Sequence, residues 1–132
     1  MRIEVDRVPT RAVGPYTPVF DAGAYLFCSG QLPLDPSTGE LVADDIEVQT
    51  ERVIDNVDAA LRSIGSALDH IVKTTVFLQT LDDFEAMNAA YGRRFSDVRP
   101  ARSTVGGVIL PRGARVEIEA IARRPEGHQG HA

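Results

Sequence analysis

The hydrophobic positions of the chain change their spacing several times, and these changes predict strands and helices in a definite order. β-Branched and aromatic residues in short runs predict strands at 19–21, 25–29, 71–78, 102–108 and 115–122. Ala22-Gly23 between the first two runs predicts a hairpin. With a helix on either side of 71–78, the order predicts an α+β sandwich, in which two helices cover one face of a mixed sheet.

The first helix carries the clearest stripe in the sequence. Its apolar residues fall at helical spacing: Ile46, Val53, Ile54, Val57, Leu61 and Ile64. Asp44 or Asp45 can cap its start, and Gly65 can close its end. The stripe therefore predicts that this helix docks on the sheet.

The second helix is predicted to begin at Asp82 or Asp83 and to stop before Pro100. Its apolar residues are Phe84, Met87, Tyr91 and Phe95. Both helices are expected on one face of the sheet, so the other face needs a different cover. Self-association would supply it.

Composition describes an ordinary soluble domain. The 132 residues are 43% hydrophobic and 25% charged, and we predict one domain over 1–123 with a disordered tail over 124–132. One cysteine excludes an internal disulfide and fits a reducing compartment. There is neither a membrane-length apolar run nor a basic-then-apolar leader, so we expect a cytoplasmic protein without membrane contact.

The charge of the chain and its sequence motifs argue against several kinds of binding site. The net charge of −5 argues against a broad nucleic-acid surface, although four arginines lie between 93 and 102. His70 stands alone and the other histidines lie in the tail, so we expect no metal site. Gly106-Gly107 falls inside a predicted strand, not at a helix start, so no phosphate loop is predicted. We expect no cofactor.

Arg102 and Glu117 form the candidate site. The last strand alternates, which puts Glu117 and Glu119 on one face, and Arg102 opens the segment before it. A planar guanidinium suits a carboxylate in two-point contact. A glutamate enclosed against a partner subunit has a raised pKa and can accept a proton. A solvated strand face has the same pattern, so the residues alone leave both interpretations open.

Three other residues have alternative interpretations. Cys28 lies in an apolar strand with no cation nearby in the sequence, which favours a buried, inert thiol over a nucleophile. Asn88 lies beside the apolar stripe of the second helix, where it either caps a backbone group or faces a ligand. Tyr16 follows Gly14-Pro15, and its position favours a surface tyrosine on a turn.

Six segments in order resemble the Rid (reactive intermediate deaminase, YjgF-type) family. They are Gly14-Pro15-Tyr16, Ser29-Gly30-Gln31-Leu32-Pro33, Thr38-Gly39-Glu40, Lys73-Thr74-Thr75-Val76-Phe77, Pro100-Ala101-Arg102-Ser103 and the run 116–122. The resemblance spans residues 14–122, nearly the whole chain.

This resemblance implies a chorismate-mutase-like fold, a homotrimer around a central sheet barrel, and clefts between subunits. It implies hydrolysis of enamines and imines, such as 2-aminoacrylate and 2-iminopropanoate, to 2-keto acids and ammonia. Arg102 would bind the substrate carboxylate and Glu117 would handle water. Tyr16 would be a third catalytic residue beside Arg102 and Glu117, and Ser29, Gly30 and Asn88 would bind the substrate.

Thr104 departs from the family pattern, because many deaminase members carry cysteine at that position. The family residue contacts ligand largely through its backbone, so Thr104 is kept as a substrate-binding residue. Two alternatives remain: a non-catalytic module that binds small carboxylates or a partner, and an endoribonuclease or translation inhibitor. The second is the weaker, because the chain is acidic and no motif supplies a general-acid histidine.

Overall fold

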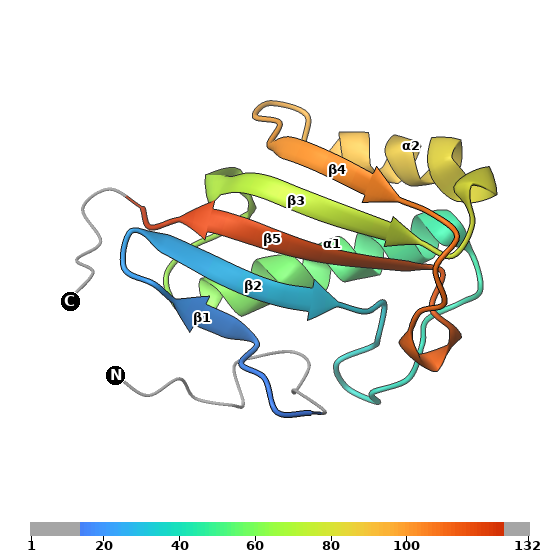
Figure 1. Cartoon of the computed structure of the whole chain (residues 1–132), viewed down its shortest axis with the longest axis horizontal. Coiled ribbons are helices and arrows are strands. Elements are labelled where there is room, and N and C mark those ends of the chain that lie inside the picture. The colour runs from blue at the N-terminus through green and yellow to red at the C-terminus, as the bar shows by residue number, and fades with distance from the viewer. Residues whose placement is uncertain (1–13, 126–132) are drawn as a thin grey trace.

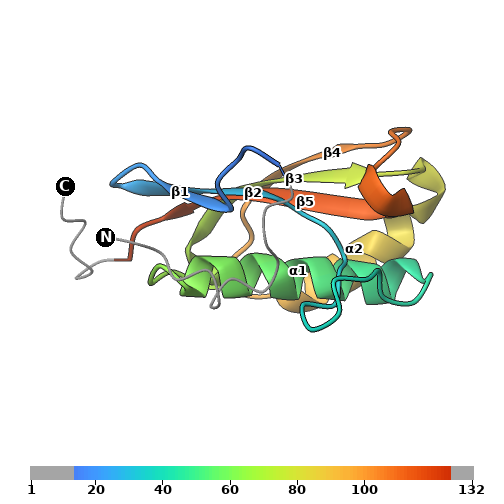
Figure 2. The same cartoon turned by 90° about the horizontal axis from the view of Figure 1, so that it is seen from below.

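A computed structural model describes residues 14–125, and these form one sheet with two helices packed on one of its faces (Figures 1 and 2). The elements in chain order are β1 (Val19–Asp21), β2 (Tyr25–Gln31), α1 (Ile46–Arg62), β3 (Ile71–Leu78), α2 (Phe84–Arg94), β4 (Ala101–Val105) and β5 (Val116–Arg123). The predicted order of strands and helices is confirmed.

The sheet is mixed, with the strand order β1-β2-β5-β3-β4. β3 and β4 pair in parallel, and the other pairs are antiparallel. This confirms the α+β class. β4 and β5 are not neighbours, because β3 lies between them. Arg102 and Glu117 lie on strands that follow one another in the chain, but these strands are not neighbours in the sheet.

Helix α1 begins where a side chain can cap it. The Asp45 carboxylate accepts a hydrogen bond of 2.9 Å from the Val48 amide, so Asp45 and not Asp44 is the cap. Val53 and Leu61, both fully buried, pack into the core between helix and sheet, and each contributes about 1.5–3 kcal/mol. The helix ends at Arg62, earlier than predicted, and Gly65 turns the chain away with a φ of 90°.

Helix α2 follows a 3₁₀ turn, Leu81–Asp83, and lies beside α1 (Figure 2). Ion pairs join the two helices: Arg93 lies 3.0 Å from Glu47, and Arg94 lies 2.8 Å from Asp55. Phe95 lies just beyond the helix and is still buried. The predicted apolar stripe thus continues past the helical residues themselves.

Strand β4 is shorter than predicted. It ends at Val105, so Gly106 and Gly107 lie beyond it and not inside it. Gly107 has a φ of 77°, a conformation that breaks a strand. A side chain at Gly106 would collide with Leu81. These two glycines let the chain leave the sheet close to the start of α2.

The helix-free face of the sheet carries exposed aromatic side chains. Phe20, Tyr25 and Phe27 are 60%, 49% and 44% exposed, more apolar surface than an isolated domain usually leaves uncovered. At the edge of this sheet, the Arg124 amide donates to the Ala24 carbonyl over 2.9 Å. The remaining tail residues, 126–132, lie outside the described residues. None of the helices described is long and apolar enough to cross a membrane.

Candidate functional site

Arg102 lies on the helix-bearing side of the sheet. It pairs in register with Thr74 of β3, and the Thr74 hydroxyl is 2.7 Å from the Tyr91 hydroxyl of α2. Paired residues point to the same face of a sheet. The guanidinium carbon of Arg102 accordingly lies 4.9 Å from the centre of the Tyr91 ring and 5.8 Å from that of Phe84.

The Arg102 guanidinium makes no ion pair with any residue in the range 14–125. Within this range its only polar contact is from Nη1 to the Met87 sulfur, at 4.0 Å, and a thioether is a weak acceptor. Nearby arginines differ: Arg94 is paired with both Glu51 and Asp55. A half-buried guanidinium whose donors lack a carboxylate is suited to binding an anionic ligand.

Two further predicted residues belong with Arg102. Thr104 lies two residues along β4 and therefore on the same face. Asn88 lies four residues after Phe84 and three before Tyr91, so it shares their side of α2. The buried Asn88 Oδ1 and Thr104 Oγ1 have no hydrogen-bond partner among the described residues. Since such atoms are costly to leave unpaired, the surroundings of Arg102 favour a polar ligand.

Glu117 lies on the opposite, helix-free face. Its neighbours Val116 and Ile118 are buried beneath the sheet, and it pairs with Phe77 of β3. The side chain is half-buried. Burial raises the pKa of the Glu117 carboxyl, and the neighbouring Glu119 carboxylate raises it further. A carboxyl with a raised pKa is a stronger proton acceptor once it is ionised.

Ser29 and Gly30 lie directly beside Glu117. The register of β2 and β5 shifts between Cys28 and Gln31, which brings this part of β2 against the glutamate. A Cβ atom at Gly30 would lie 2.9 Å from the Glu117 carboxyl carbon. The absence of a side chain at Gly30 therefore provides the space that the carboxylate occupies.

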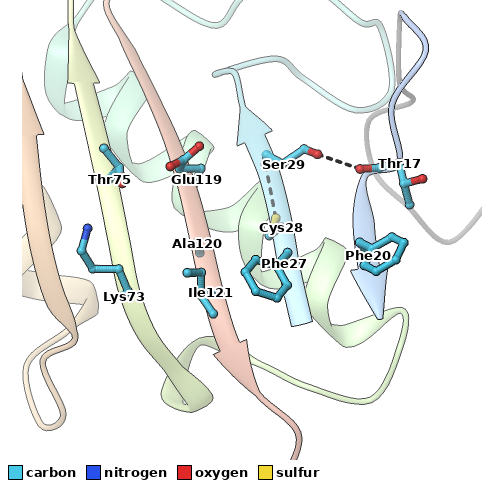
Figure 3. A pocket seen from close by; sticks show the side chains of 10 residues that line it. All are labelled: Thr17, Phe20, Phe27, Cys28, Ser29, Lys73, Thr75, Glu119, Ala120 and Ile121. Atoms are coloured by element: carbon cyan, nitrogen blue, oxygen red, sulfur yellow. Dashed lines mark hydrogen bonds between the residues drawn. The ribbon is translucent and has the colours of Figure 1, made fainter. Parts of the chain in front are cut away.

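Tyr16 is held near β2 by a hydrogen bond to the next residue in the chain, Thr17. The Ser29 hydroxyl donates to the Thr17 carbonyl over 2.7 Å, which ties the segment before β1 to β2 (Figure 3). Tyr16 is 47% exposed. Ser29, Gly30 and Glu117 thus lie together, with Tyr16 attached nearby, whereas Arg102 and its neighbours lie on the other face.

Within one chain the predicted site is therefore divided. The helix-free set holds Glu117 and its β2 neighbours, and the helix-side set holds Arg102, Thr104 and Asn88. Within a single chain Arg102 and Glu117 do not converge. The family resemblance predicts that they meet in a cleft between subunits, and this stays a prediction.

A pocket of about 370 Å³ lies on the helix-free face, across β1, β2, β5 and β3 (Figure 3). Lys73 and Glu119 are its charged residues, and Lys73 Nζ is 3.4 Å from the Ser103 hydroxyl. Sequence analysis did not assign these two to the site. The alternation of hydrophobic and polar residues along their strands could have indicated them, because it places both on the face opposite the core.

Cys28 is inert, as its apolar strand predicted. The side chain is buried, and burial raises the pKa of its thiol to about 12. The thiol is thus protonated at neutral pH, where a nucleophile would need a thiolate. Within residues 14–125, no three His, Cys, Asp or Glu side chains gather as metal ligands.

The fold and these residues define a small α+β protein with an unpaired arginine near one sheet edge and a half-buried glutamate on the open sheet face. The family model described as endoribonuclease L-PSP matches residues 7–124. The chain belongs to this family, which is the Rid or YjgF-type family that its motifs resemble.

Individual relatives match over nearly their whole length. Protein DfrA of Myxococcus xanthus is 48% identical over 122 residues, or 91% of this chain and 92% of that protein. The structure of the YjgF gene product from E. coli is 40% identical, with a TM-score of 0.86, and covers 95% of this chain and 99% of its own. E. coli TdcF with bound serine is 40% identical, with a TM-score of 0.85 over 93% and 98%.

Proposed function

We propose that this protein is an enamine/imine deaminase. It hydrolyses 2-imino acids, such as the 2-iminopropanoate that forms from 2-aminoacrylate, to 2-keto acids and ammonia. The observation that carries this proposal is the Arg102 guanidinium, which is half-buried, fixed against α2 and without a carboxylate partner among the described residues. A 2-imino acid presents a carboxylate directly next to its electrophilic C=N carbon.

Arg102 holds the substrate by that carboxylate. Hydrogen bonds to charged groups contribute about 1.5–3 kcal/mol, and a two-point contact also fixes the orientation of the adjacent carbon. The serine bound to the relative TdcF also carries a carboxylate, in keeping with this class of ligand.

Glu117 activates water. Its carboxylate takes a proton while the water oxygen bonds to the imine carbon and the C=N π electrons move to nitrogen. The proton taken by Glu117 passes to that nitrogen, which gives the carbinolamine. The C–N bond then breaks as the C=O bond forms, the hydroxyl proton passes through Glu117 to the departing nitrogen, and ammonia and a 2-keto acid are released. The imine carbon is itself the electrophile, so the reaction needs no electron acceptor from a cofactor.

The reacting residues come from two copies of the chain. Arg102 and Glu117 face opposite sides of the sheet, so one copy contributes the arginine and the next contributes the glutamate. We propose a homotrimer in which the helix-free faces surround a central barrel. Phe20 and Phe27 support this proposal, because they are exposed in the single chain and such an assembly would bury them.

The test is a coupled assay in which a serine dehydratase releases 2-aminoacrylate and pyruvate formation is followed. The wild-type protein should accelerate the release of pyruvate. Arg102→Ala should lower that acceleration by about ten- to a hundredfold, because a charge-assisted contact is lost. Glu117→Gln should lower it by about a hundredfold, because the proton acceptor is lost.

Arg52→Ala is the matched control. Arg52 lies on α1, where it makes a 3.9 Å contact with Asp55 and belongs to neither set of site residues, so its loss should leave the rate unchanged. No acceleration by the wild-type protein, or full activity in Arg102→Ala, would contradict the proposal.

A second candidate is a carboxylate-binding module without chemistry. The unpaired Asn88 and Thr104 oxygens favour it, because they provide ligand contacts but no proton acceptor. Calorimetric binding of pyruvate, with no turnover of several imines, would decide for this candidate.

The family description also names an endoribonuclease. The net charge of −5 and the lack of a general-acid histidine in any sequence motif make this the weaker alternative. RNA cleavage that survives both Arg102→Ala and repeated purification would favour it.

A further inference from the structure

Tyr91 is fixed at two points in the core. It is 7% exposed, and its hydroxyl lies 2.7 Å from the Thr74 hydroxyl of β3. Its ring centre is 4.6 Å from that of Phe95, with the planes tilted by 37°. Since α2 and β3 hold opposite ends of the side chain, the plane of the ring is set by both layers of the fold.

One face of this fixed ring supports Arg102. The guanidinium carbon lies 4.9 Å from the ring centre, within the range of a cation–π contact. Burial raises the pKa of the Tyr91 phenol, so a neutral ring and not a phenolate faces the cation at physiological pH. The attraction is therefore to the ring face itself.

This support differs in kind from an ion pair. A carboxylate would hold the arginine but would also occupy the N–H donors that a ligand needs. An aromatic face contacts the guanidinium from above its plane and leaves the donors at its edge available. Arg115 shows the other arrangement, because its Nη2 lies 2.8 Å from Asp83.

We propose that Tyr91 is a positioning residue whose ring face orients the Arg102 guanidinium for two-point binding of the substrate carboxylate. The proposal rests on the proposed function for the role of Arg102. It adds a residue that sequence analysis placed only in the apolar stripe of the second helix.

The first experiment compares Tyr91→Leu with Tyr91→Phe. Leucine removes the ring, so the calorimetric Kd for pyruvate and the KM for the imino acid should rise by about three- to tenfold, with kcat little changed. Phenylalanine keeps the ring and loses only the Thr74 contact, so Kd should stay near the wild-type value although Tm falls. An unchanged Kd in Tyr91→Leu, or an equal rise in both variants, would overturn the proposal.

Val57→Ala controls for general loosening of the core. Val57 is buried on α1, whereas Tyr91 and Arg102 lie on α2 and β4. This variant should lower Tm without moving Kd. A rise in Kd that matches that of Tyr91→Leu would show a non-specific effect and overturn the proposal.

A measurement on the unliganded wild-type protein tests the position of Arg102 independently of the proposed function. It also keeps the proposal testable if the Tyr91→Leu chain fails to fold. The Arg102 side-chain NMR signals, assigned by comparison with Arg102→Lys, should show an upfield ring-current shift that Tyr91→Phe retains. Signals at free-arginine positions would overturn the positioning role. The shift with no pyruvate binding and no turnover would refute the deaminase while leaving the geometry intact.

Discussion

Glu117 shows how a single side chain acquires its chemistry from its neighbours. Its carboxylate occupies the space that Gly30 leaves open, and burial there raises the pKa of the carboxyl above its usual range. Glu119, two residues along the same face, adds a second negative charge that acts in the same direction. Burial is the larger cause of the raised pKa of Glu117, and the charge of Glu119 is the smaller one.

Replacement of Glu119 should move the pH dependence of the proposed reaction. Glu119→Gln removes a negative neighbour, so the ionised form of Glu117 becomes easier to reach and its pKa falls. The base then remains ionised to lower pH, and the acid limb of the kcat/KM profile should shift toward lower pH. A pH–rate series with wild type and Glu119→Gln checks this, with Glu85→Gln on the exposed side of α2 as control. A shift toward higher pH would contradict the assigned role of Glu119.

At the scale of elements, α1 illustrates how one hydrogen bond selects a helix boundary. Asp44 and Asp45 are equivalent in the sequence pattern, but only Asp45 accepts from the Val48 amide. Asp44 instead lies 3.3 Å from Arg115 and is largely exposed. An N-cap satisfies an otherwise unpaired helix amide, whereas an exposed ion pair contributes little.

The two aspartates should therefore differ in their effect on stability. Asp45→Ala should lower the free energy of unfolding by about 1 kcal/mol. Asp44→Ala should lower it by less, about 0–0.5 kcal/mol. Urea unfolding at a fixed protein concentration measures both, since self-association would make the midpoint concentration-dependent. Equal losses in the two variants would contradict the assignment of Asp45 as the cap.

At the scale of the whole molecule, β3 decides the arrangement of the site. It lies between β4 and β5, and alternation along it directs Thr74 toward the helices and Phe77 toward the open face. Arg102 pairs with Thr74 and points to the same face, and Glu117 does the same with Phe77. Within one chain the two residues therefore lie on opposite faces of the sheet. The proposed reaction, which uses both residues, therefore calls for a second copy of the chain.

Mixed assemblies test this requirement. Arg102→Ala and Glu117→Ala chains should each be inactive alone, but chains unfolded together and refolded at a 1:1 ratio should regain activity. In a cyclic trimer about three quarters of the assemblies are mixed, and each mixed ring restores one of its three sites. The mixture should therefore show about a quarter of wild-type activity. Refolding each variant alone is the control, and an inactive mixture would refute a site shared between copies.

The sequence by itself determined the elements and the family. The spacing of hydrophobic residues depends on local backbone geometry. The apolar stripe of α1, the β-branched run of β3 and the hairpin at Ala22-Gly23 could therefore all be predicted from the sequence alone. Ordered motifs added the candidate residues Arg102 and Glu117. The boundary errors fall where a distant contact or a positive φ intervenes, as at Gly106 beside Leu81 and at Gly65.

Only the tertiary structure decided which residues meet. Strand order is not encoded in alternation, so nothing in the sequence placed β3 between β4 and β5 or put Arg102 and Glu117 on opposite faces. The support of Arg102 by Tyr91 was equally hidden, because an aromatic in an apolar stripe looks like any core residue until its neighbours are known. Local pattern fixes each element, whereas the site depends on register and packing between segments far apart in the chain.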